Sequence, residues 1–149
     1  MTGESAMPVI GVVSDTSVVY QWFHTEGEND VEASRALVRL YGVRSISLSV
    51  LDLTRYELGN VVQRGRAQAT AGQTAAVLDR LARVCPVITP TASDLRHATQ
   101  LAEEHHLTLY DATYAAVARA RGAELATLDK ALLKAGLGHR PSEIVAMVR

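Results

Sequence analysis

Short apolar runs alternate along this chain with longer segments in which apolar residues recur every three or four positions. The continuous run at residues 9–14 is typical of a strand buried on both faces, and the alternating run at residues 46–50 also indicates a strand. The longer segments, such as residues 51–64 and 112–121, have the spacing of helices. Strands that alternate with helices predict a parallel sheet covered on both faces. We therefore expect a three-layer α/β/α fold with a central, mostly parallel sheet.

Three further runs complete the predicted sheet, at residues 87–89, 124–128 and 144–148. Asp30 stands where it could cap the helix that follows it. No linker or repeat divides the sequence, so we expect a single domain over residues 1–149, with the polar residues 1–7 flexible.

The composition and net charge of the chain exclude few classes of function. With 15 basic and 16 acidic residues the net charge is -1, which argues against binding nucleic acid by bulk charge but leaves room for a local groove. The single cysteine, Cys85, excludes an internal disulfide and is expected to be buried. No apolar run approaches the ~20 residues of a membrane span, and residues 1–7 do not resemble a signal peptide. We therefore expect a cytoplasmic protein.

Four acidic residues follow the predicted strands. Asp15 and Asp129 come directly after apolar runs, Asp111 begins a late helix, and Glu57 lies beside the apolar face of an earlier helix. In a parallel sheet the carboxyl ends of the strands share one edge, where ligands bind. We therefore expect these four acids to lie close together.

Each acid also has a simpler structural interpretation when it is taken alone. Asp15 could form an Asx-turn, Asp111 and Asp129 could be helix N-caps, and Glu57 could be a solvated helix residue. Taken together, however, neighbouring carboxylates without an obvious cation need a metal to stay ionised. An all-oxygen set of ligands suits Mg²⁺ or Mn²⁺.

The sequences around these acids carry a family resemblance. They read V-S-D-T-S at 13–17, Y-E-L-G-N-V-V at 56–62, Y-D-A-T-Y-A-A-V-A at 110–118 and L-A-T-L-D at 125–129. In this order and spacing they resemble the PIN domains, and within them the VapC-type toxins of bacterial toxin–antitoxin pairs. The resemblance covers nearly the whole chain and implies an α/β/α fold and a metal-dependent endoribonuclease that cleaves transfer or ribosomal RNA.

The resemblance also implies roles for individual residues and a set of partners. The catalytic and metal-binding residues would be Asp15, Glu57, Asp111 and Asp129, with Ser17 and Thr127 as polar helpers. The partners would be a VapB-type antitoxin that obstructs the site and a second copy of the chain in a homodimer.

The expected chemistry needs no nucleophilic side chain, because a metal can activate water and offset the charge that develops on a phosphate. RNA would be held near the acids by cations, although each of these could equally be a solvated surface residue. The candidates are Arg55, Arg64, Arg66, Arg119 and Lys130. The aromatic residues Tyr20, Trp22 and Phe23, close to Asp15 in the sequence, could stack on bases, contact a partner or pack in the core.

Other functions remain to be weighed against this one. A haloacid-dehalogenase-type phosphatase would carry Asp-x-Asp, but Ser17 stands where its second acid would be. A P-loop enzyme is excluded because the sequence has no G-x-x-x-x-G-K-[ST]. A stand-alone PIN ribonuclease and a non-catalytic PIN-like module that binds RNA or protein are the remaining alternatives.

Overall fold

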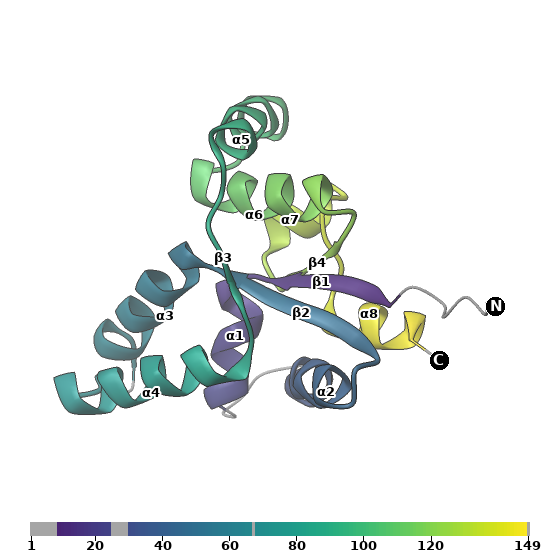
Figure 1. Cartoon of the computed structure of the whole chain (residues 1–149). Coiled ribbons are helices and arrows are strands. Elements are labelled where there is room, and N and C mark those ends of the chain that lie inside the picture. The colour runs from purple at the N-terminus through teal and green to yellow at the C-terminus, as the bar shows by residue number, and fades with distance from the viewer. Residues whose placement is uncertain (1–8, 25–29, 67, 149) are drawn as a thin grey trace.

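A parallel four-stranded sheet forms the centre of the protein (Figure 1). The computed structural model describes residues 9–24, 30–66 and 68–148. The strands are β1 (Ile10–Ser14), β2 (Ile46–Leu51), β3 (Val87–Ile88) and β4 (Glu124–Ala126), and their order in the sheet is β3-β2-β1-β4. Because β1 pairs in parallel with both β2 and β4, the carboxyl ends of the earliest and the latest strand lie side by side.

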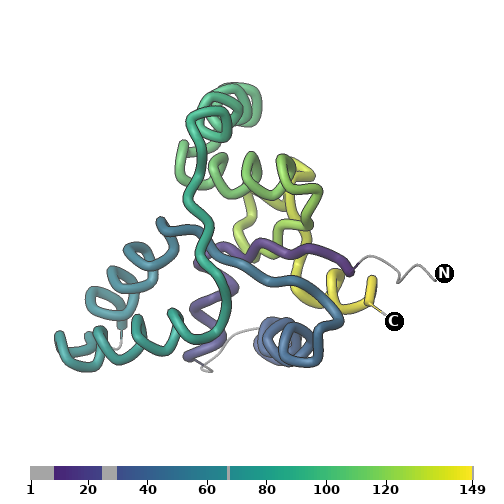
Figure 2. The backbone as a smooth tube through the Cα atoms, viewed as in Figure 1, coloured from purple at the N-terminus to yellow at the C-terminus, as the bar shows by residue number. Residues whose placement is uncertain are grey.

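Helices cover both faces of this sheet, as Figures 1 and 2 show. One layer contains α1 (Thr16–Phe23), α2 (Val31–Gly42), α3 (Asp52–Arg64), α4 (Ala71–Val84) and α8 (Pro141–Met147). The other contains α5 (Ala92–His105), α6 (Leu109–Ala120) and α7 (Lys130–Lys134). The predicted three-layer α/β/α fold is therefore confirmed.

The continuous apolar run of β1 is explained by these two layers. Val12 belongs to the core beneath α1 and α2, whereas the adjacent Val13 belongs to the core beneath α6. Both side chains are 1% exposed. Consecutive residues of a strand point to opposite faces of the sheet. Because both faces are covered here, apolar residues are not confined to every second position of the strand.

The predicted last strand, residues 144–148, is wrong, because residues 144–147 lie in helix α8 and Val148 is its C-cap. Pro141 at the first turn suits a helix start, and the Arg140 amide donates to the Glu143 carboxylate at 2.9 Å. Ile144 is fully buried in the core on the α1 and α2 side of the sheet. A short apolar run does not distinguish a strand from a buried helical turn.

The predicted cap of α2 is also wrong. Asp30 does precede α2, but its backbone is left-handed, with φ 67°, and its carboxylate makes no capping hydrogen bond. Instead it accepts from Arg140 Nη1 at 3.2 Å. Asp30 therefore joins the start of α2 to the start of α8 rather than closing its own helix.

Three further expectations concerned Cys85, membrane-spanning segments and the first seven residues. Cys85 is buried, 6% exposed, as predicted. Among the described residues, no helix combines the length and apolarity needed to cross a membrane. Residues 1–7, expected to be flexible, lie outside the described part of the chain.

Candidate active site

Asp15 lies at the carboxyl end of β1 and begins the construction of the site. Its amide donates to the Ala126 carbonyl at 3.0 Å, which fixes it to the end of β4. Its carboxylate caps α1, since Oδ1 accepts from the Ser17 amide at 3.0 Å and the Val18 amide at 3.4 Å. The side chain is thus oriented by two strands and a helix, and the residue is only 5% exposed.

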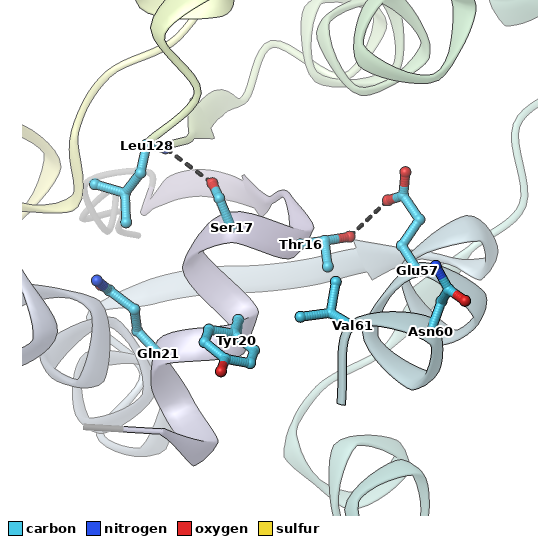
Figure 3. A pocket seen from close by; sticks show the side chains of 8 residues that line it. All are labelled: Thr16, Ser17, Tyr20, Gln21, Glu57, Asn60, Val61 and Leu128. Carbon is cyan, nitrogen blue, oxygen red and sulfur yellow. Dashed lines mark hydrogen bonds between the residues drawn. The ribbon is translucent and has the colours of Figure 1, made fainter. Parts of the chain in front are cut away.

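Two hydroxyl groups complete the surroundings of Asp15. Ser17 Oγ donates to Oδ1 at 2.5 Å, and Thr127 Oγ1 donates to Oδ2. The Ser17 hydroxyl also accepts from the Leu128 amide at 3.0 Å, so it joins α1 to the segment after β4 (Figure 3). Ser17 and Thr127 therefore hold the Asp15 carboxylate in one orientation.

Burial raises the pKa of Asp15 to about 6. Desolvation is the largest cause, the hydrogen bonds from Ser17, Thr127 and Val18 oppose it, and the nearby charge of Asp111 adds to it. A group with this pKa is mostly ionised at pH 7, at a cost in stability that a bound cation would offset.

The raised pKa of Asp15 should make the free energy of unfolding depend on pH. Between its ordinary pKa of 3.8 and about 6, folded Asp15 binds more protons than unfolded Asp15. The metal-free protein should therefore lose stability as the pH rises through this window, by up to about 3 kcal/mol. Asp111, whose pKa is also raised, acts in the same direction. Denaturant unfolding at pH 4–8 measures the effect, and a profile unchanged by Asp15→Asn would contradict it.

Glu57 extends from α3 toward the same region, where two hydroxyl groups hold one of its oxygens. Glu57 Oε1 accepts from Thr16 Oγ1 at 2.6 Å and from the Tyr114 hydroxyl at 2.7 Å. The Tyr114 hydroxyl also lies 2.7 Å from Thr54 Oγ1, and Tyr114 is 1% exposed. Since Tyr114 has one proton and gives it to Glu57, Thr54 is the donor in the Thr54–Tyr114 pair.

Sequence reasoning did not identify this hydroxyl network of Thr16, Thr54 and Tyr114. A signal was available for two of the three residues. Thr16 directly follows Asp15, and Tyr114 stands three positions after Asp111, where a helix presents the same face. Burial raises the pKa of Tyr114, so its hydroxyl stays protonated and able to donate to Glu57.

Tyr114→Phe should lower the free energy of unfolding by about 1–2 kcal/mol, because it leaves the buried Thr54 hydroxyl without its acceptor. Tyr110→Phe is the matched control, since Tyr110 lies on the same helix but is 62% exposed. The control should change stability by less than about 0.5 kcal/mol. Denaturant unfolding of both variants makes the comparison, and equal effects would argue against a stabilising network at Tyr114.

Asp111 lies in the first turn of α6, and its side chain is not the helix cap. Thr108 is the N-cap and accepts from the Asp111 amide at 3.1 Å, which leaves the Asp111 carboxylate free of this role. Burial raises the pKa of Asp111, and the charges of Asp129 and Glu57 raise it further, against a lowering hydrogen bond from Thr108. Asp111 is therefore close enough to Asp129 and Glu57 to interact electrostatically with both.

Asp129 is the N-cap of α7, one of the roles that the sequence allowed for it. Its Oδ1 accepts from the Leu132 amide at 3.1 Å at the start of α7. This leaves its second oxygen for another contact. Through Asp111, the structure links Asp15, Glu57 and Asp129 into one group of interacting charges, which we call the acid cluster.

The acid cluster fits a hard divalent cation in its chemistry. All its donors are carboxylate oxygens, and no ion pair between described residues includes any of its members. Across residues 9–24, 30–66 and 68–148, no three acidic, histidine or cysteine side chains are arranged to hold a metal by themselves. Mg²⁺ commonly retains several waters and uses only one or two carboxylates, so this open arrangement suits it.

A pocket of about 520 Å³ opens beside the acid cluster, between α1 and α3 (Figure 3). Thr16 and Glu57 lie at one end, while Tyr20, Val61 and Leu128 supply apolar surface. None of the described residues that line this pocket is basic. The cations predicted from the sequence to bind RNA do not line this pocket. They are exposed on α3, after the end of α3, on α6 and on α7, and they are Arg55, Arg64, Arg66, Arg119 and Lys130.

The three aromatic residues of α1 have separate surroundings. Trp22 is 8% exposed and donates from Nε1 to the Ser34 carbonyl at 2.9 Å, so it belongs to the core. Tyr20 stacks on His24, with ring centroids 4.5 Å apart, and lines the pocket. Phe23 lies under the Arg80 guanidinium. Only Tyr20 is placed to meet a ligand at the acid cluster.

Several solved structures share this fold. PAE2754 from Pyrobaculum aerophilum is 25% identical, covers 93% of this chain and 94% of its own, and superposes with a TM-score of 0.67. Mycobacterium tuberculosis VapC20, described as a sarcin-ricin loop cleaving toxin, is 20% identical, with coverages of 84% and 95% and a TM-score of 0.64. A toxin–antitoxin complex from Klebsiella pneumoniae is 18% identical, with coverages of 87% and 97% and a TM-score of 0.64.

Comparison of the sequence with curated proteins gave no match. Comparison with protein-family models gave a match to the PIN domain over residues 12–137, a span that includes every member of the acid cluster. Because this match covers most of the sequence and the fold agrees with it, the chain belongs to the PIN domain family.

Proposed function

We propose that this protein is a metal-dependent endoribonuclease, the toxin of a VapBC-type toxin–antitoxin pair, that cleaves transfer or ribosomal RNA. The observation that carries the proposal is the acid cluster, whose interacting carboxylates have no cationic partner among the described residues. PIN domains are nucleases that generally use divalent metal ions, which supports the same chemistry.

In this proposal Asp15 and Asp111 are the nearest metal ligands, and Glu57 and Asp129 act through water or on a second ion. When Mg²⁺ or Mn²⁺ is bound it supplies an activated water near neutral pH and offsets charge on the phosphate. The residues around Asp15 and Glu57 would hold these carboxylates in the orientation that metal binding requires.

The fixed groups restrict where a cation can bind. Ser17, Val18 and Thr127 hold Asp15, so its carboxylate is already oriented without a cation and would need little rearrangement to bind one. Thr16 and Tyr114 hold Glu57 by Oε1 and leave Oε2 free of both. This preorganisation keeps negative charge directed at one place.

A small VapB-type antitoxin is the proposed protein partner, and a second copy of the chain completes a proposed homodimer. The Klebsiella pneumoniae structure of the same fold is a toxin–antitoxin complex, which supports such a partner here. An arginine from the antitoxin, placed against the acid cluster, would neutralise the carboxylates and block metal and RNA together.

Cleavage of a mixed pool of transfer and ribosomal RNA by the purified protein tests the proposal. Parallel reactions contain Mg²⁺, Mn²⁺ or a chelator, and the cut ends are mapped. We expect cleavage at defined positions only with a divalent metal. RNA binding without cleavage, by folded protein free of an antitoxin, would instead favour the non-catalytic PIN-like module.

A further inference from the structure

A second pocket, of about 510 Å³, lies at the other end of α1 from Asp15 and is lined by four arginines. Arg35 and Arg39 come from α2, and Arg80 and Arg83 come from α4. Phe23, the last residue of α1, lies among them. We call this the arginine pocket. It holds four of the chain's 15 basic residues, although the net charge of the chain is -1.

Carboxylates among the described residues compensate little of the positive charge of the arginine pocket. In the described part of the chain, Arg35, Arg80 and Arg83 form no ion pair with a carboxylate. Arg39 lies 3.8 Å from Glu32, but both side chains are mostly exposed, and such a pair is weak. Four guanidinium groups around one hollow repel one another, and a bound anion would relieve that repulsion.

Two of these arginines are already held in position. Arg35 Nε donates to the Gln21 carbonyl at 3.0 Å, which ties it to α1. The Arg80 guanidinium lies 5.1 Å from the centre of the Phe23 ring, a cation–π contact. A ligand would therefore have less side-chain freedom to restrict, which favours binding.

Helix α1 connects the arginine pocket to the acid cluster. Its 8 residues begin directly after Asp15 and end at Phe23, a length of about 12 Å at 1.5 Å per residue. A bound RNA strand can cross this distance within a few nucleotides.

We propose that the arginine pocket binds backbone phosphates of single-stranded RNA, within a few nucleotides of the bond that the acid cluster cleaves. This inference rests on the proposed function. The acid cluster repels RNA, and none of the described residues that line the pocket beside it is a cation, so a cationic surface further away is needed to attract RNA. Arginine forks match phosphate oxygens, and the arginine pocket presents four of them, with no strong ion pair to a carboxylate among the described residues.

RNA binding without cleavage tests this inference. Fluorescence anisotropy would follow a labelled 12-nucleotide RNA with Asp111→Asn protein in chelator. Adding Arg80→Gln and Arg83→Gln should weaken binding at least about 5-fold and reduce the slope of log K against log salt by about 1.4, or 0.7 for each lost phosphate contact. The matched control adds Arg44→Gln and Arg96→Gln, an equal loss of charge at exposed positions, and should change affinity less than 2-fold.

Each outcome separates the possible ligands. Equal weakening in the Arg80/Arg83 pair and the control overturns the inference. Uridine monophosphate that binds wild-type protein through Arg80 and Arg83, with RNA affinity unaffected, overturns it in favour of a free nucleotide. A polyglutamate peptide that binds through Arg80 and Arg83, again with RNA affinity unaffected, overturns it in favour of an acidic protein segment.

The binding experiment does not depend on the nuclease activity. If the wild-type protein cleaves RNA but the Arg80/Arg83 pair binds it as the control does, only the arginine pocket is refuted. If RNA binding depends on Arg80 and Arg83 but no metal supports cleavage, the pocket stands and the proposed ribonuclease fails.

Discussion

Asp111→Asn is expected to reduce RNA cleavage by at least about 100-fold, because even residues that only orient a metal ligand typically cost 10- to 100-fold. The same change should raise the stability of the metal-free protein at neutral pH. Burial and the charges of Asp129 and Glu57 raise the pKa of Asp111, so its ionised form is disfavoured in the folded state. Asparagine removes that charge while keeping nearly the same shape.

These opposite effects distinguish a functional carboxylate from a structural one. Cleavage assays and thermal unfolding of the metal-free protein would be measured together. Asp79→Asn is the control, since Asp79 is exposed on α4 outside the acid cluster, and both properties should stay near those of the wild type. Full cleavage by the Asp111 variant, or a loss of stability, would count against the assigned role.

Asp15 should behave differently from Asp111, because its carboxylate also holds the fold together. Asp15→Asn and Asp15→Ala should both abolish cleavage, but the alanine variant should be about 1 kcal/mol less stable than the asparagine variant. The asparagine oxygen can still cap α1, whereas alanine removes the cap, worth about 1 kcal/mol. The Thr127 hydroxyl loses its acceptor in both variants, because the asparagine amide nitrogen that replaces Oδ2 is a donor.

The comparison of two uncharged variants isolates this structural role, since neither carries the buried charge of the wild type. Denaturant unfolding at pH 7 measures the difference. Stabilities within about 0.5 kcal/mol of one another would mean that the capping hydrogen bonds to Asp15 contribute little to the fold.

The sequence predicted the fold and the position of the acids because both follow from local patterns. The apolar run that ends at Asp15 identified a buried strand and its carboxyl edge, and the structure confirms β1 there. The resemblance to PIN domains is confirmed by the family match. The catalytic and metal-binding roles of the four acids stay predictions.

What the sequence could not predict depends on contacts between distant segments. Tyr114 looks like one more apolar residue of α6, and its hydroxyl partners Glu57 and Thr54 lie 57 and 60 positions away. The arginine pocket is drawn from α1, α2 and α4, and each arginine alone resembles a solvated helix residue. At α8 the pattern was truly ambiguous, because a short apolar run suits a strand or a helix.

The pairing of β1 with β4 has a consequence for synthesis of the protein on the ribosome. Asp15 emerges before β4 is made, but it is fixed by the Ala126 carbonyl and the Thr127 hydroxyl, the latter 112 positions later. A nascent chain, or one truncated by a premature stop codon before β4, therefore has an open sheet edge at β1 and an incomplete acid cluster. The site therefore cannot assemble during translation until β4 and Thr127 have been made.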